Sequence, residues 1–417
     1  QNGYNRIAAY FAHFTKSKYT SRKYFCVSCG RRLFCRPGPL AVQGRQATLP
    51  DGAESRLPGS GHILYDLKEV PMAKNIIIGQ SGGPTAVINS SLAGVYKAAR
   101  SLGADKVYGM KYGIEGLLKE ELLELNVLLG ARMRIELLKR TPSSYLGSIG
   151  VPKTIDNALC LTDHTPGYGS AAKYIATILK EVIRDSSVYN IRSVTVAEIM
   201  GRHAGWLAGA ACLAGGEDCE GPDLILLPEV PFDQDKFLAR VDELQRVKSN
   251  VIIAASEGVK TADGTYLCDL VSTAGQLDAF GRKAILSGTS RYLSELIHDK
   301  LQCKSRAIEF STLQRCASHL ASRTDVNEAY AVGGAAAAAA FAGESGRMIA
   351  LKRVSNYPYQ CITESVDVQQ VANLEKKVPL EWITPDGMQV TEAFEEYARP
   401  LILDEVTPVY VNGTPRH

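Results

Sequence analysis

The stretch VPKTIDN (residues 151–157) places an ammonium and a carboxylate three residues apart, as Lys153 and Asp156. Glycine and proline flank it, which predicts a loop. In phosphoryl transfer a carboxylate can take the proton of the attacking hydroxyl, while an ammonium neutralises charge on the moving phosphate. The default alternative is an Asx-turn beside a solvated lysine. The pair therefore indicates phosphoryl transfer only with support from other residues.

Groups that suit sugar or phosphate binding follow four predicted strands, at the ends where ligands bind in open parallel sheets. They are the Gly82–Gly83 turn, Arg202, Glu257 and Arg315. Backbone N–H groups of a glycine turn can approach an anion, Arg can fork onto phosphate, and Glu can accept sugar hydroxyl protons. Each alone is as well explained by a structural turn or a surface salt bridge. Four such groups at one edge of the sheet favour a binding site. The glycine turn itself matches neither the Walker loop nor the dinucleotide fingerprint.

The elements that must position these groups alternate from Met72 onward as short apolar strands and amphipathic helices, which predicts an α/β fold with parallel sheets. Predicted helices are the segment with Ile88, Leu92, Val95 and Ala99 at helical spacing, the segment 169–185, and the alanine run 335–340. The predicted strands are Asn75–Gly79, Ser193–Ile199, Asp223–Glu229, Asn250–Ser256 and Arg306–Phe310.

Composition excludes several classes of protein. The chain has 417 residues, 45% hydrophobic and 22% charged, and no apolar run long enough to span a membrane. Its ten cysteines are scattered within apolar segments, which suits reduced thiols in the cytoplasm. Residues 1–71 carry a net charge of +7 and the remaining 346 residues −4. The acidic remainder gives no reason to expect nucleic-acid binding.

The first 71 residues show neither helical nor strand periodicity. Cys26, Cys29 and Cys35 could form half of a zinc site beside a basic arm, but a second pair of ligands is missing. No Met precedes Met72, a strand follows it at once, and the codons for the preceding KEVP could contain a ribosome-binding sequence. We therefore expect residues 1–71 to be translated leader outside the fold.

The motifs together resemble the phosphofructokinase family, within it the pyrophosphate-dependent branch, from Met72 to Pro415. The resemblance rests on GGPTAVIN, TPSSYLGS, PKTIDN, TDHTPGYGSAAKYIA, MGRHAGWLA, PEVPF, SEG and IEFSTLQRCASHLASRTD, in family order. It implies two Rossmann-like domains with mostly parallel sheets. We expect residues 72–192 to form the donor-phosphate domain, and residues 193–417 the sugar-phosphate domain with C-terminal segments returning to the first.

The resemblance also implies a reaction, the Mg²⁺-dependent phosphorylation of fructose 6-phosphate at C1, in a cytoplasmic homodimer or homotetramer. Asp156 would be the base, assisted by Lys153 and Thr154. Lysine at position 153 is typical of pyrophosphate users, whereas ATP users carry glycine. Gly82, Gly83 and Lys153 would bind the diphosphate, and Arg306 would reach across a subunit interface. The residues expected at fructose 6-phosphate are Thr154, Ile155, Asp156, Met200, Gly201, Arg202, Glu257, Arg306, Gln314 and Arg315.

One piece of the family pattern is missing. Family members carry some tens of residues between LGS and GVPKTIDN, with a Gly-Gly-x-Asp-Ser turn that helps hold magnesium and the donor. Here Ser148 is joined directly to Ile149, and Ala158 replaces a second expected aspartate. The metal ligands are therefore unknown. Two function classes stay open: a pyrophosphate-dependent (or ATP-dependent) phosphofructokinase, impaired or intact, and a catalytically inactive sugar-phosphate-binding relic.

Overall fold

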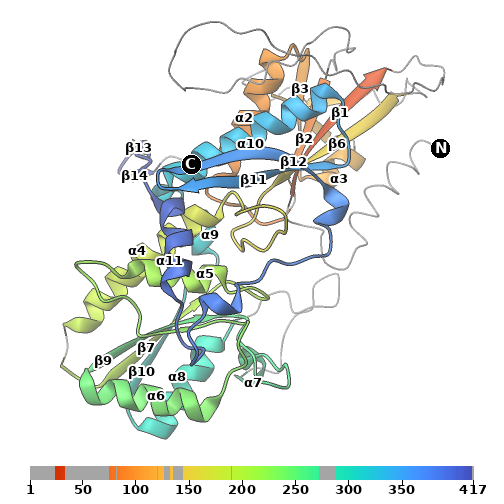
Figure 1. Ribbon diagram of the computed structural model, residues 1–417. Coiled ribbons are helices and arrows are strands. Elements are labelled where there is room, and N and C mark those ends of the chain that lie inside the picture. The colour runs from red at the N-terminus through yellow and green to blue at the C-terminus, as the bar shows by residue number, and fades with distance from the viewer. Residues whose placement is uncertain are drawn as a thin grey trace, which may run out of the picture.

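The computed structural model describes residues 24–32, 75–80, 82–119, 121–125, 132–134, 144–188, 190–271 and 287–415. The described residues form two large sheets, each with helices packed against it, and a two-stranded sheet near the C-terminus (Figure 1). In the upper, larger sheet the strands lie in the order β12 (Tyr359–Asp367), β11 (Arg347–Asn356), β6 (Ser144–Pro152), β1 (Tyr24–Arg32), β2 (Asn75–Gln80), β3 (Lys106–Met110), β4 (Glu121–Glu124) and β5 (Arg132–Arg134).

Two helices that lie far apart in the sequence cover this sheet together, α2 (Ile88–Ser101) and α10 (Arg323–Ala342) (Figure 1). They approach so closely that a Cβ at Gly94 would lie 2.1 Å from the carbonyl oxygen of Tyr330. A Cβ at Gly333 would lie 2.2 Å from the carbonyl oxygen of Ser91. Glycine is therefore required on both helices. The alanine run 335–340 lies inside α10, which confirms the predicted helix.

The strand β1 departs from the sequence-based expectation for residues 1–71. It lies between β2 and β6 and pairs antiparallel with both, with Val27 opposite Ile78 on one side and Ile149 on the other. Unpaired backbone N–H and C=O groups at the middle of a sheet are costly, and β1 satisfies those of both neighbours. These nine residues are therefore part of the first sheet, whereas the sequence predicts a leader that lies outside the fold. The rest of the segment lies outside the described residues.

The second sheet is parallel throughout, in the order β10 (Lys304–Glu309), β7 (Ser193–Ile199), β9 (Asn250–Ser256) and β8 (Leu224–Leu226). Three of its strands are buried along almost their whole length, as parallel strands covered on both faces must be. The predictions for β7 and β9 are confirmed residue for residue. Strand β8 is shorter than the predicted strand Asp223–Glu229. Strand β10 begins two residues before the predicted strand Arg306–Phe310.

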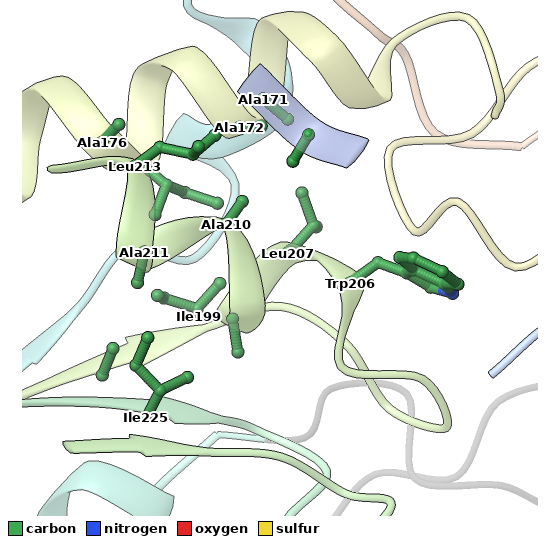
Figure 2. Packing of buried hydrophobic residues seen from close by; sticks show 14 of the residues in the cluster. Ala171, Ala172, Ala176, Ile199, Trp206, Leu207, Ala210, Ala211, Leu213 and Ile225 are labelled. Carbon is green, nitrogen blue, oxygen red and sulfur yellow. The ribbon is translucent and has the colours of Figure 1, made fainter. Parts of the chain in front are cut away.

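Helices cover both faces of the second sheet. On one face lies α4 (Tyr168–Ser187), which confirms the predicted helix, with α5 (Trp206–Gly209) and the 3₁₀ helix η1 (Ala210–Ala214). Figure 2 shows how the small side chains Ala171, Ala172 and Ala176 of α4 pack over Leu207, Ala210, Ala211 and Leu213, above Ile199 and Ile225 of the sheet. The other face packs against α6 (Gln234–Val247) and α8 (Thr289–Leu301).

The C-terminal part of the chain touches both sheets. After α10, strands β11 and β12 extend the first sheet, and α11 (Glu392–Ala398) then packs against the core of the second. The boundary expected at residue 192 stays a prediction. No helix among the described residues is long and apolar enough to cross a membrane. The remaining short elements are α3 (Ile114–Leu118), α7 (Leu267–Val271), α9 (Leu313–Cys316), η2 (Ser318–Leu320), η3 (Val368–Gln370), η4 (Leu380–Trp382), η5 (Arg399–Ile402), β13 (Tyr410–Val411) and β14 (Thr414–Pro415).

Candidate active site

Lys153 and Thr154 begin the loop that follows β6, and both side chains are buried. Only 3% of Lys153 is exposed, and its Nζ donates a hydrogen bond to the carbonyl oxygen of Gly83 at 2.5 Å. The carbonyl oxygen of Thr154 accepts a hydrogen bond from Oγ1 of Thr165 at 2.6 Å. The loop after β6 therefore lies against the glycine turn after β2, although about 70 residues separate them in the sequence.

Glu257 follows β9 and lies within electrostatic reach of Asp156. Burial raises the pKa of Glu257 to about 8, and the negative charge of Asp156 contributes to the rise. A backbone hydrogen bond from Gly201 and the charge of Arg202 act in the opposite direction without cancelling it. At neutral pH Glu257 therefore keeps its proton. A protonated carboxyl group in such a site can donate a hydrogen bond to a bound hydroxyl group.

The loop after β7 brings Met200, Gly201 and Arg202 to the same sheet edge. Gly201 has a φ of +148°, and a Cβ there would lie 2.7 Å from the carbonyl oxygen of Ala204. Its own carbonyl oxygen accepts a hydrogen bond from Oγ of Ser256 at 2.6 Å. Only glycine fits this conformation, so the tight turn sets where Arg202 leaves the strand.

Arg315 lies on α9, directly after β10, and contacts the glycine turn of the first sheet. A Cβ at Gly83 would be 2.6 Å from Nη1 of Arg315. The neighbouring Gln314 is buried, and its Oε1 accepts a hydrogen bond from the backbone N–H of Met200 at 3.2 Å. Its Nε2 donates to the carbonyl oxygen of Ser311 at 3.1 Å. Gln314 thus holds the loop after β7, and its expected contact with the sugar stays a prediction.

Two residues of the predicted set lie apart. Arg306 is the third residue of the edge strand β10, and its Nη1 pairs with Oδ2 of Asp185 at 3.3 Å on an exposed surface. Because the site lies at the carboxyl ends of the strands, Arg306 does not reach it within one chain. The side chain of Ile155 packs in the core of the second sheet, so only its backbone can face a ligand.

The residues that hold Asn157, the neighbour of Asp156, could not be recognised from the sequence. Asn157 has a φ of +54°, and its Nδ2 donates to Oη of Tyr397 at 2.8 Å. Its Oδ1 accepts hydrogen bonds from the backbone N–H of Thr165 at 3.1 Å and from Nζ of Lys376 at 3.4 Å. Asn tolerates positive φ better than most residues, so a turn could have been inferred there. No local pattern points to partners more than 200 residues away.

A metal site is not formed by the described residues. No group of three or more His, Cys, Asp or Glu side chains among them could hold a metal ion. The zinc hypothesis for Cys26, Cys29 and Cys35 gains no support there, since Cys35 and the side chains of β1 lie outside what is described. The residues that the structure describes therefore contain no preformed set of three such ligands for a magnesium ion.

The site thus places Asp156 and Lys153, which follow a strand of one α/β sheet, with Arg202 and Glu257, which follow strands of the other. This is the architecture of a phosphotransferase. The family model for phosphofructokinase matches residues 130–340. The pyrophosphate–fructose 6-phosphate 1-phosphotransferases of Halomonas elongata and Methylococcus capsulatus are each 36% identical to this chain, over 82% of it and 95% of their own sequences. The chain belongs to the phosphofructokinase family.

Solved structures of pyrophosphate-dependent phosphofructokinases are similar to this chain in fold. The pyrophosphate-dependent phosphofructokinase of Marinobacter aquaeolei superposes with a TM-score of 0.71 at 34% identity, covering 82% of this chain and 95% of that one. The enzyme from Nitrosospira multiformis gives 0.69, also at 34% identity, with 80% and 93% covered. These matches confirm the expected two-domain α/β fold.

The alignments also bear on the missing piece. The match to the Halomonas protein extends over 404 positions, yet 82% of this 417-residue chain is only about 342 residues. Roughly 60 aligned positions of that protein therefore have no counterpart here. These positions can be divided among any number of gaps in the alignment, so the expected loss of a segment between Ser148 and Ile149 stays a prediction.

Proposed function

We propose that the acceptor site takes fructose 6-phosphate and that the ancestral reaction is phosphorylation of its C1 hydroxyl by pyrophosphate. The observation that carries this proposal is the meeting of Asp156 and Arg202 with the protonated Glu257 at the carboxyl ends of strands from both sheets. The names of the relatives supply the substrates.

Asp156 takes the proton of the C1 hydroxyl as that oxygen attacks the donor phosphorus. Glu257, which holds a proton at neutral pH, donates a hydrogen bond to a sugar hydroxyl. Arg202 and Arg315 bind the 6-phosphate, since a guanidinium fork matches phosphate oxygens. The turn at Gly201 keeps the backbone clear of the sugar.

The donor half is incomplete. Gly82 and Gly83 offer backbone N–H groups and Lys153 a positive charge suited to pyrophosphate. In this chain Nζ of Lys153 bonds the carbonyl oxygen of Gly83, and Arg315 lies against the same glycine. Magnesium would accompany the donor phosphates, but the described residues do not supply a ligand set for it. We therefore infer that transfer by this chain is severely impaired.

The chain keeps the acceptor residues and lacks the donor turn. A second candidate function is therefore a protein that binds a sugar phosphate without transferring a phosphoryl group. An ATP-dependent phosphofructokinase is a weaker alternative, because Lys153 occupies the position where ATP users have glycine. We further propose a cytoplasmic homo-oligomer, in which Arg306 of one copy reaches the site of another.

The test compares the chain as it is with a repaired version. Calorimetry should detect fructose 6-phosphate binding by both, and a coupled assay should detect transfer only after the family segment is inserted between Ser148 and Ile149. The repaired protein should prefer pyrophosphate to ATP, and Lys153→Gly should reduce that preference. Vigorous pyrophosphate-dependent turnover by the unrepaired protein would contradict the impairment, and a repaired protein that prefers ATP would contradict the role of Lys153.

A further inference from the structure

A short segment near the C-terminus, Lys376–Val378, contacts both loops that carry the acceptor residues. We call it the tie segment. It belongs to neither sheet and runs between the loop after β6, which carries Asp156, and the loop after β7, which carries Arg202. Lys376 contacts both loops and Val378 contacts the second, through hydrogen bonds that are partly buried.

Lys376 makes the contacts to the first loop. Its backbone N–H donates to the carbonyl oxygen of Ala158 at 3.0 Å. Its Nζ donates to the carbonyl oxygens of Asp163 at 2.5 Å and Thr162 at 3.2 Å, and to Oδ1 of Asn157 at 3.4 Å. Nζ of Lys376 therefore forms hydrogen bonds with both ends of the segment 157–163, which follows Asp156 directly.

The contacts to the second loop run through Glu229 and Trp206. The backbone N–H of Val378 donates to Oε1 of Glu229 at 3.0 Å. The same carboxylate accepts the backbone N–H of Gly205 at 2.9 Å, three residues after Arg202. Nε1 of Trp206 donates to the carbonyl oxygen of Lys376 at 2.8 Å, and the Lys376 ammonium lies 5.0 Å from the centre of the Trp206 ring.

The tie segment thus connects two loops that follow strands of different sheets and carry the proposed acceptor residues. The partly buried ammonium of Lys376 satisfies three oxygens, and the partly buried carboxylate of Glu229 accepts two backbone N–H groups, so shifting either side chain leaves polar groups without these partners. We propose that Lys376 and Glu229 are positioning residues, which set the separation of Asp156 from Arg202 and Glu257 and thereby tune affinity for the acceptor. This inference rests on the proposed acceptor site.

The experiment compares Lys376→Met, Lys376→Arg and Glu229→Gln with Lys377→Met, a change at the exposed neighbour. Each variant is studied at a temperature where circular dichroism shows it fully folded. Fructose 6-phosphate affinity, measured by calorimetry, should fall roughly 3- to 30-fold in Lys376→Met and Glu229→Gln. It should recover in part in Lys376→Arg and stay unchanged in Lys377→Met. A residue that only stabilised the fold would lower the melting temperature and leave affinity intact.

A second measurement needs no ligand. Because the charge of Asp156 helps to raise the pKa of Glu257, whose other charged neighbours are Arg202 and Glu198, moving Asp156 away lowers that pKa. Carbon NMR of the Glu257 carboxyl, assigned with Glu257→Gln, should show its titration at lower pH in Lys376→Met and Glu229→Gln. If the parent chain fails to bind fructose 6-phosphate, the proposed function is wrong, and the titration still decides the role of the tie segment. An unchanged titration and unchanged affinity in folded variants would overturn the inference.

Discussion

His164 carries a buried charge whose contribution to stability can be worked out from its neighbours. The ring is 1% exposed, with Nδ1 2.8 Å from Oδ2 of Asp163 and Nε2 2.6 Å from Oε2 of Glu328. Because both nitrogens face carboxylate oxygens, both carry protons. Burial alone would disfavour this charge, but Glu328 and Asp163 outweigh it and raise the pKa of His164 from 6.5 to about 9.

The sign of the pH dependence follows from linkage. Between pH 6.5 and 9 the folded protein binds a proton at His164 that the unfolded chain releases, so this stabilisation is complete below 6.5 and is lost as the pH rises through 9. The rise of the His164 pKa from 6.5 to about 9 corresponds to roughly 3 kcal/mol. Replacing His164 by Gln removes this contribution, and it also removes the positive charge that lowers the pKa values of Asp163 and Glu328.

We therefore expect the difference in unfolding free energy between the parent and His164→Gln to shrink by about 3 kcal/mol from pH 6 to pH 10. Urea unfolding at a series of pH values measures this difference directly. His298→Gln, the same substitution at an exposed position, is measured beside it as the control for the change of residue type. A pH-independent difference for His164→Gln would show that the ring is neutral in the folded protein and refute the reasoning.

Three further predictions concern the site and the sheet. Asp156→Asn, introduced into the repaired protein, should lower turnover by about 10²–10⁴ in the coupled assay and spare fructose 6-phosphate binding; retained turnover would remove Asp156 from the role of base. Arg315→Ala should weaken fructose 6-phosphate binding by about 2–3 kcal/mol by calorimetry, and an unchanged affinity would place the phosphate elsewhere. Val27→Pro removes a backbone donor from β1 and should speed amide exchange at Ile78 and Ile149. Unchanged exchange there, with proteolytic trimming to Met72, would favour the leader hypothesis.

Local sequence was sufficient for some of the regular elements and for one side of the site. Strands β7 and β9 could be predicted to the residue because buried parallel strands are short, continuous apolar runs between polar ends. Arg202 and Glu257 could be assigned to one edge for the same reason: each follows such a strand, and carboxyl ends of parallel strands share an edge.

The relations between distant segments were decided only by the tertiary structure. That β1 fills the space between β2 and β6 depends on which unpaired backbone groups need partners, and no periodicity in residues 1–71 signals it. Lys376 could have been a surface lysine by sequence alone, yet it lies partly buried beside Trp206 and donates hydrogen bonds to the loop of Asp156. Sequence determines the conformational preference of a segment, because that depends on neighbouring residues. The hydrogen-bond partner of a polar group inside the fold can lie hundreds of residues away in the sequence. Only the folded molecule therefore determines these pairs.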